Sequence, residues 1–182
     1  MAQPVSAPEL EALLQQLLRP VRLASSVRVQ CAAAGDYAAG DVMSSIVTDT
    51  LGRATYVPNL ALDKGGLATI VTIRARCSIA AVANNLRLHF FKQAPLVAEV
   101  EMDDNAVFAL TTAAGRDNHV GSILLSAFVS RGGVGATSDN TDLLQAFVCD
   151  PNDAGLWMVV VTEQIEANEA ANMTYDLDFY CR

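Results

Sequence analysis

Residues 69–79, TIVTIRARCSI, carry the pattern that decides the fold. Apolar and polar side chains alternate along this stretch, and a period of two places them on opposite faces of a β-strand. One face would carry Val71, Ile73, Ala75, Cys77 and Ile79, and the other Thr72, Arg74, Arg76 and Ser78. Residues 174–181, TYDLDFYC, repeat the alternation. Both stretches predict strands that bury one face and expose the other.

Eight further segments are short, rich in β-branched and aromatic residues, and bounded by turn-forming residues. They are residues 27–32, 42–48, 86–92, 96–101, 107–111, 120–129, 145–149 and 156–163. Gly, Asn, Asp and Pro separate them, and no helical period occurs between the strands. About ten short strands at this spacing predict a mainly β fold, an antiparallel two-sheet sandwich or jelly roll.

One short amphipathic helix is expected before the strands, over residues 6–19. Ser6 and Glu9 have the spacing of a capping box, and Pro20 would end the helix. Its apolar face would consist of five leucines: Leu10, Leu13, Leu14, Leu17 and Leu18. The prediction therefore divides the chain into an N-terminal helical arm and linker, residues 1–26, and a β-sandwich or jelly-roll domain, residues 27–182.

A helix of this length is marginal alone in water, so its leucine face must pack against something. Three packing partners are open. The helix could join three copies of the chain in a small bundle, lie in a groove of another protein, or fold back on its own sandwich as a lid. The leucine face is thus a candidate protein-interaction site.

Charge and hydropathy exclude several classes of partner. The chain of 182 residues has a formal net charge of −8, and residues 133–180 contain no Lys or Arg. Such a distribution disfavours binding to a phosphate backbone, so no nucleic-acid partner is expected. No apolar stretch is long enough to span a bilayer, and residues 1–20 lack the pattern of a signal peptide. We expect a cytosolic product with no membrane partner.

The residues that usually carry chemistry are sparse and scattered. Cys31, Cys77, Cys149 and Cys181 form no C-x-x-C pair, which predicts buried free thiols rather than disulfides or a zinc site. The two histidines lack a second His or Cys at ligand spacing. His89 is expected to be a surface or hydrogen-bonded histidine, and His119 a loop residue. No metal or other cofactor is predicted.

Other motifs of enzymes also fail to match. The run Gly132-Gly133-Val134-Gly135 fits neither a P-loop nor a dinucleotide fingerprint, and it is interpreted as a loop tip. No Ser or Cys lies in a nucleophile motif. Two acidic groups are interpreted as solvated turns rather than as calcium sites, because they lack EF-hand spacing: Asp103-Asp104-Asn105, and Asp139, Asn140 and Asp142. The sequence therefore predicts a non-enzymatic protein.

Four short segments of the sequence together resemble segments of small virion proteins of tailed bacteriophages. They are residues 37–42 (YAAGDV), 70–73 (IVTI), 85–91 (NLRLHFF) and 105–110 (NAVFAL). More narrowly, residues 27–182 resemble capsid decoration, or cement, proteins with a β-sandwich body. The resemblance implies a homo-oligomer, with a trimer as the expected form, that binds the major capsid protein on the outer surface of an icosahedral shell. It implies a virion protein that is assembled in the host cytoplasm and needs no cofactor.

The residues alone also favour an assembly component, because a large apolar fraction, 52%, can be buried between subunits. Two rival classes stay open. One is a carbohydrate- or receptor-binding module of a phage tail or fibre, in which Trp157, Tyr37 or Tyr56 would stack on sugar rings. The other is a jelly-roll enzyme that uses a metal.

Overall fold

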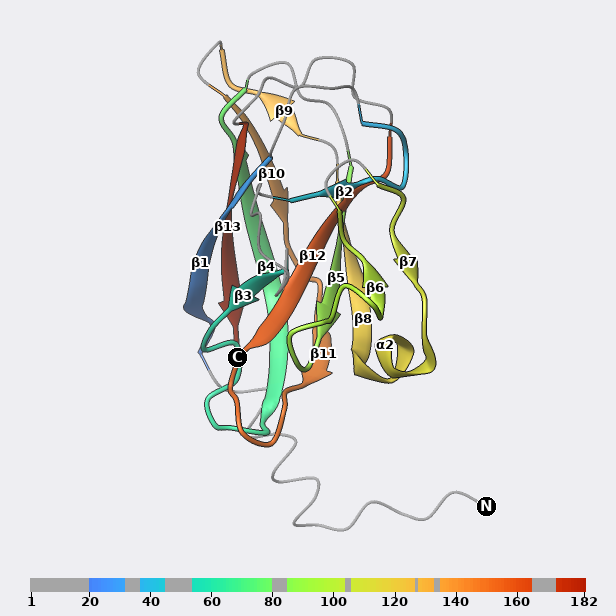
Figure 1. Cartoon of the computed structure of the whole chain (residues 1–182). Helices are drawn as coiled ribbons and strands as arrows, with labels where there is room; N and C mark the ends of the chain where they lie inside the picture. The colour runs from blue at the N-terminus through green and yellow to red at the C-terminus, as the bar shows by residue number, and fades with distance from the viewer. Residues whose placement is uncertain are drawn as a thin grey trace, which may run out of the picture.

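The computed structural model describes residues 20–31, 37–44, 54–79, 85–103, 106–126, 128–132, 135–164 and 173–182. Within these ranges, two antiparallel sheets lie face to face and form a sandwich (Figure 1). The predicted fold class, a mainly β antiparallel two-sheet sandwich, is confirmed. The predicted helix over residues 6–19 lies outside the described residues.

The larger sheet has six strands in the described part of the chain. Their order is β1 (Arg22–Gln30), β13 (Thr174–Cys181), β4 (Leu67–Cys77), β10 (Ala136–Asn140) and β9 (Val129–Ser130), and β11 (Gln145–Val148) also pairs with β4. The long strand β4 is central because β13 pairs with one edge, while β10 and β11 share the other. The alternation in residues 69–79 therefore belongs to the centre of this sheet.

The smaller sheet contains five strands among the described residues. Its order is β2 (Val42–Met43), β12 (Leu156–Thr162), β5 (Leu86–Phe91) and β8 (His119–Leu125), and β3 (Thr55–Val57) pairs with β12 beside β2. Nearly every residue of β12 is buried, which is unusual for a strand of a two-layer sandwich. The smaller sheet must therefore be covered on both of its faces.

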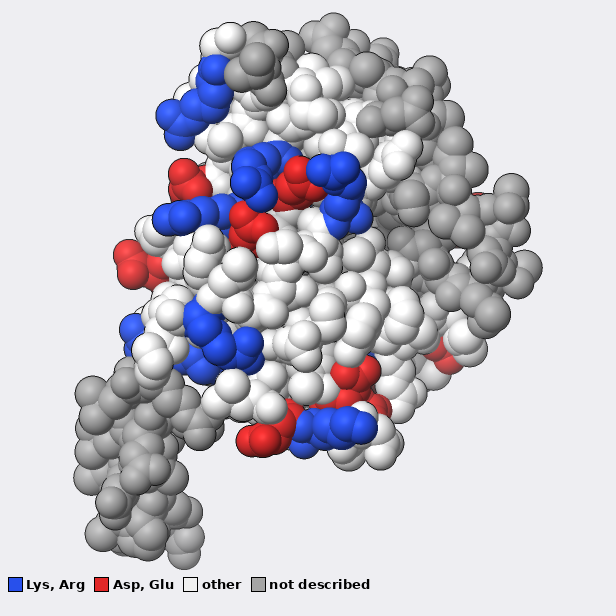
Figure 2. Space-filling model, turned by 90° about the vertical axis from the view of Figure 1, so that its left-hand side faces the viewer, with Lys and Arg blue, Asp and Glu red and all other residues white. Residues whose placement is uncertain are grey.

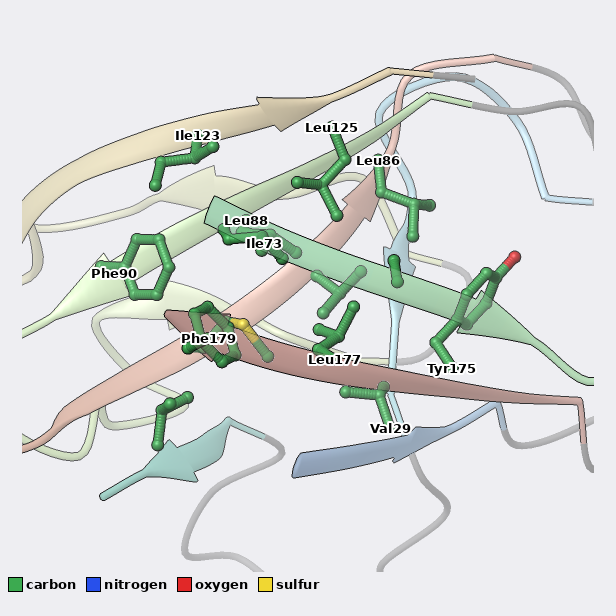
Figure 3. Close-up of a cluster of buried hydrophobic side chains, with 14 of the residues drawn as sticks. Val29, Ile73, Leu86, Leu88, Phe90, Ile123, Leu125, Tyr175, Leu177 and Phe179 are labelled. Atoms are coloured by element: carbon green, nitrogen blue, oxygen red, sulfur yellow. The ribbon is translucent and has the colours of Figure 1, made fainter. Parts of the chain in front are cut away.

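Alternating apolar side chains from both sheets form the main core between them (Figure 3). Leu177 and Phe179 of β13 and Leu88 and Phe90 of β5 are all fully buried there. The planes of the Phe90 and Phe179 rings make an angle of 78°, with 6.2 Å between the centroids. An edge-to-face contact of this kind stabilises the packing beyond the area that it buries.

A long excursion of the chain covers the outer face of the smaller sheet. We call residues 92–118, which connect β5 to β8, the flap. They include β6 (Val100–Glu101), β7 (Ala109–Leu110) and the short helix α2 (Ala113–Asn118). Apolar flap residues pack with the outward side chains of β12 and β5 in a second hydrophobic cluster, made of Val42, Ala54, Phe91, Val100, Met102, Val159 and Val161, with Phe108, Leu110 and Trp157 at its border. This cluster explains the burial of β12 on both faces.

Hydrogen bonds close the base of the flap and attach its middle to the sandwich. At the base, the backbone N–H of Lys92 donates to the carbonyl of Asn118 at 3.1 Å. The side-chain oxygen of Asn118 accepts from the N–H of Gln93 at 2.8 Å. In the middle, Phe108 N–H donates to the carbonyl of Gly40 at 2.9 Å. The flap is therefore held at its ends and near its centre.

The structure corrects several predicted boundaries. β1 begins at Arg22, so part of the predicted linker, residues 22–26, belongs to the sheet. Segment 96–101 is a strand only at its last two residues, and segment 120–129 divides between β8 and β9. The strands β3 and β10 and the helix α2 lie outside the predicted segments.

The prediction that Asp139 and Asn140 form a solvated turn is wrong, because both belong to β10. Two of the three inward residues of this strand, Ser138 and Asn140, are polar, which hides the usual apolar alternation. Their hydrogen bonds are made inside the fold: Ser138 donates to the carbonyl of Ser126 at 2.7 Å, and Asn140 accepts from the N–H of Ser126 at 2.8 Å. Hydrogen bonds between buried polar groups thus take the place of the apolar face by which a strand is recognised in the sequence.

Candidate functional site

The outer face of the larger sheet carries an ordered band of charged side chains. Their position follows from the strand period, since the polar residues of β4 and β13 all point away from the core. We call this group the ladder, and it consists of Arg28, Arg74, Arg76, Arg131, Asp139, Asp176 and Asp178. Figure 2 shows basic and acidic groups interleaved in a band across this side of the molecule, with a broad uncharged area below it.

The first rung joins Arg28 of β1 to Asp176, its cross-strand partner on β13. The guanidinium donates two hydrogen bonds, from Nε to Oδ1 at 2.6 Å and from Nη2 to Oδ2 at 3.0 Å. A bidentate contact of this type fixes both side chains in one geometry. The hydrogen bond from Arg28 lowers the pKa of the Asp176 carboxyl below its ordinary value.

The second rung is centred on Asp178 of β13. Its carboxylate accepts from Arg76 Nη2 at 2.9 Å and from Ser26 Oγ at 2.6 Å, so strands on both sides hold it. The Asp178 side chain is only 15% exposed, whereas that of Arg76 is 58% exposed. The carboxylate is therefore enclosed, and the guanidinium remains accessible to a partner.

The third rung is more open. Arg74 Nε lies 3.7 Å from Asp139 Oδ1, and the guanidinium lies 5.2 Å from the centre of the Tyr180 ring. Arg131 Nε donates to Thr137 Oγ1 at 2.8 Å. A shallow depression lies between these side chains and is lined by Arg74, Arg76, Arg131, Asp139, Asp178 and Tyr180. The ladder holds four arginines and three aspartates, so it has one positive charge in excess on a chain of net charge −8.

Exposed apolar side chains lie on the same face. Leu23 of β1, which is 54% exposed, lies opposite Tyr180. Further along β4, Leu67 pairs with Val148 of β11, and they are 38% and 53% exposed. The face thus combines fixed charges with apolar contacts, which is the composition of many protein interfaces.

A second arrangement lies beneath the flap and consists of two histidines. Nδ1 of His89, on β5, lies 3.2 Å from Nε2 of His119, the first residue of β8. His89 also stacks on Phe108 of the flap, with 4.0 Å between the ring centres, and His119 contacts the edge of Phe91. Both imidazoles are partly buried. The chain contains only these two histidines.

Burial decides the protonation of this pair. It lowers the pKa of His89 to about 3, and the neighbouring His119 and Arg87 act in the same direction. Burial also lowers the pKa of His119, against a backbone hydrogen bond with Gly121 that raises it. Both rings are therefore neutral near pH 7, and one donates its ring N–H to the other.

Sequence reasoning missed this pair. It is correct that His89 is a hydrogen-bonded histidine, but the prediction that His119 is a loop residue is wrong, because His119 opens a strand. The two residues lie 30 positions apart, and only the pairing of β5 with β8 brings them together. In the described part of the chain, no group of three or more His, Cys, Asp or Glu side chains could hold a metal ion.

All four cysteines are buried free thiols, as predicted. Burial raises the pKa of Cys149 to about 11 and that of Cys181 to about 12. Their thiolate forms are therefore scarce at neutral pH, and these thiols are poor nucleophiles in the folded protein.

The aromatic residues considered for sugar stacking differ in accessibility. Tyr37 is only 1% exposed, so the expectation that it could stack on a sugar ring is wrong. Tyr56 and Trp157 are half-buried and lie side by side, with ring centres 5.2 Å apart. The Tyr56 hydroxyl donates to Asp153 Oδ1, and burial together with this bond raises the pKa of Tyr56 to about 12.

The remaining predicted site is the leucine face of the N-terminal helix. Its residues lie outside the described part of the chain: Leu10, Leu13, Leu14, Leu17 and Leu18. None of the helices in the described ranges has the length and apolar character needed to cross a membrane. No protein-family model matches the sequence, and a search of curated proteins also finds no match.

Proposed function

We propose that this chain is a non-enzymatic structural protein of a bacteriophage virion. In this proposal it is a capsid decoration protein that self-associates, as a trimer in the expected form, and binds the major capsid protein on the outer surface of the shell. The ladder and the apolar residues beside it form the contact face.

The observation that supports the proposal most directly is the fixed geometry of the ladder. Arg28 and Arg76 are held by carboxylates on neighbouring strands before any partner arrives. Side chains that are already ordered lose less conformational entropy on binding, so more of the contact energy remains as affinity. A rigid sheet face of this kind suits an oligomer that must match a repeating shell.

The charge of the face also favours a protein partner. Its excess positive charge and the accessible Arg74, Arg76 and Arg131 would attract an acidic surface and set the orientation of docking. Leu23, Leu67 and Val148 would supply the apolar contact that charges alone do not give. An acidic surface can come from a second copy of this chain or from a capsid protein.

Two measurements on the full chain test the proposal. Sedimentation equilibrium should give the mass of an oligomer of the 19.3 kDa chain, with a trimer as the expected form. If a major capsid gene lies beside the gene for this chain, shells assembled from that capsid protein should bind the chain in co-sedimentation. Arg131→Glu should weaken binding at least tenfold, because it reverses an exposed charge whose loss leaves the Arg28–Asp176 and Arg76–Asp178 pairs intact.

The matched control is Arg116→Glu, which reverses an exposed charge on the flap, away from the ladder. This variant should bind shells like the unmodified chain. Equal binding by both variants would exclude the ladder as the contact face. A monomer without affinity for the shells would refute the decoration function itself.

The alternative function, binding of a glycan or receptor by a tail or fibre module, is favoured by one arrangement. Tyr56 and Trp157 form an aromatic pair beside the carboxylate of Asp153. Such a pair can stack on sugar rings, while the carboxylate accepts hydrogen bonds from the sugar hydroxyl groups. A glycan array tests this function. Binding that is lost in Trp157→Ala without loss of the fold would support it, and an array without hits would remove it.

A further inference from the structure

We propose that the hydrogen-bonded pair of His89 and His119 is an acid-sensitive latch that holds the flap, residues 92–118, on the smaller sheet. This inference concerns the far side of the molecule from the ladder and does not depend on the proposed virion function.

The position of the pair is suited to a latch. His89 lies on β5, shortly before the chain enters the flap, and His119 is the first residue after the flap ends. Phe108, from the middle of the flap, stacks on His89 with 4.0 Å between the ring centres. The hydrogen bond therefore joins the two strands that flank the flap, and the stacking of Phe108 ties the centre of the flap to this pair.

The pair can hold only while at least one facing nitrogen is unprotonated. In the neutral state, one imidazole donates a ring N–H and the other accepts it over 3.2 Å. When both rings are protonated, every ring nitrogen carries a hydrogen, and two N–H groups face each other. The hydrogen bond is then replaced by repulsion between two cations in a poorly hydrated place.

The surroundings offer little to offset this repulsion. From β5, Arg87 adds a positive charge, and its guanidinium is already paired with Glu163, which follows β12. From β12, the residue opposite His89 is Val159, and from β8 it is Ser122. The flap places the ring of Phe108 on His89. By sequence, the charged residues of the flap are Lys92, Glu99, Glu101, Asp103, Asp104, Arg116 and Asp117.

The direction of the response follows from linkage. Both histidines have lowered pKa values in the closed protein, about 3 for His89, whereas a hydrated imidazole has a pKa of about 6.5. The open state therefore takes up protons first as the pH falls below about 6.5. For each histidine that is protonated in the open state and neutral in the closed state, the equilibrium constant for opening rises by up to about tenfold when the pH falls by one unit.

Opening would expose an apolar surface. Phe91, Val159 and Val161 of the smaller sheet are buried by the flap, as are Val100 and Met102 of the flap itself. Release would uncover these side chains without disturbing the main core, which lies on the other face of the sheet. The latch would thus convert acidification into exposure of a new contact surface.

The single tryptophan provides the assay, because Trp157 packs at the border of the cluster beneath the flap. In buffers with EDTA, its emission should shift to the red between about pH 7 and about pH 4.5, above the ordinary pKa of carboxyl groups. Hydrogen exchange should accelerate in residues 92–118 over the same range, while β4 and β13 stay protected.

The matched variant is His89→Gln with His119→Gln, which leaves no histidine in the chain. Whether its flap is open or closed, its emission and flap exchange should not change with pH in this window. If the variant keeps the transition of the unmodified chain, the latch is refuted, because the transition then belongs to other groups. An unmodified chain that shows no transition above about pH 4.5 refutes it as well.

Imidazole resonances of the unmodified protein give a measurement that needs no variant. Both rings should remain neutral until the emission of Trp157 begins to shift, and they should then titrate together with that shift. A His89 ring that titrates near its ordinary value of about 6.5, with the emission unchanged, would overturn the proposal.

Discussion

Replacing Gly115 by alanine tests the packing of α2 on the segment that contains Glu99, a contact within the flap. Gly115 is the buried residue of α2, and a Cβ atom placed on it would lie 2.4 Å from the backbone carbonyl oxygen of Glu99. Non-bonded carbon and oxygen atoms do not approach this closely, and a backbone oxygen cannot move as a flexible side chain does. α2 must therefore shift away from the segment that contains Glu99.

Two effects of opposite sign determine how much Gly115→Ala changes the free energy of unfolding. Alanine is favoured over glycine inside a helix by about 1 kcal/mol, which would stabilise the variant. Forcing an extra methyl group into a packed contact typically costs about 1–3 kcal/mol. The approach of the new Cβ atom to the Glu99 oxygen is about 1 Å too short, so the upper end of that range, about 3 kcal/mol, applies. After the gain in helix propensity of about 1 kcal/mol is subtracted, Gly115→Ala should lower the free energy of unfolding by about 2 kcal/mol.

Urea denaturation, followed by Trp157 fluorescence and by far-ultraviolet circular dichroism, measures the loss. The control is Ala114→Gly, an exposed position of the same helix, which should cost about 1 kcal/mol through propensity alone. A Gly115→Ala variant that is as stable as the unmodified chain, or more stable, would refute the close packing of α2 on Glu99.

Further predictions concern the core, the ladder, the thiols and the N-terminal segment. Phe179→Ala should destabilise the protein by about 3–5 kcal/mol in urea denaturation, because it empties the centre of the main core. Asp178→Asn should cost about 1 kcal/mol by the same measurement, since Arg76 and Ser26 lose a charged acceptor. Iodoacetamide at about pH 8 should modify Cys149 and Cys181 slowly in the folded protein and rapidly in urea, because their raised pKa values suppress the thiolate; rapid modification without urea would contradict their burial. Deleting residues 1–20 should leave the circular dichroism spectrum of the β-sandwich but weaken self-association in sedimentation; unchanged association would exclude the leucines of that segment as an interface.

The sequence predicts those parts of the fold whose strands have one apolar face. β13 alternates strictly and β4 alternates from Val71 onward, so their existence, their direction of burial and the outward position of Arg74 and Arg76 all follow from a period of two. β10 carries no such signal, because Ser138 and Asn140 turn polar groups inward and satisfy them through Ser126. Its place in the sheet is fixed by its pairing with β4.

In the candidate sites too, some features follow from the local sequence pattern and others depend on long-range pairing. The alternation places His89 and Arg87 on one face of β5, and this much is visible in the sequence. Which residue faces His89 across the sheet depends on the register of β5 with β8, and local patterns do not encode that register. The flap adds a second long-range contact, since Phe108 stacks on His89 in a segment whose backbone is bonded to residues 40–42.

The order of the strands in the larger sheet has a consequence for synthesis of the protein. Among the strands that the structure describes, β1 pairs only with β13, and every partner of β4 comes from residue 136 or later. A growing chain on the ribosome therefore carries both strands without these partners until the later residues that pair with them have emerged. Closure of this sheet is expected to wait for the synthesis of residues 174–181, and a chain that stops short of residue 174 loses the strand that joins β1 to β4.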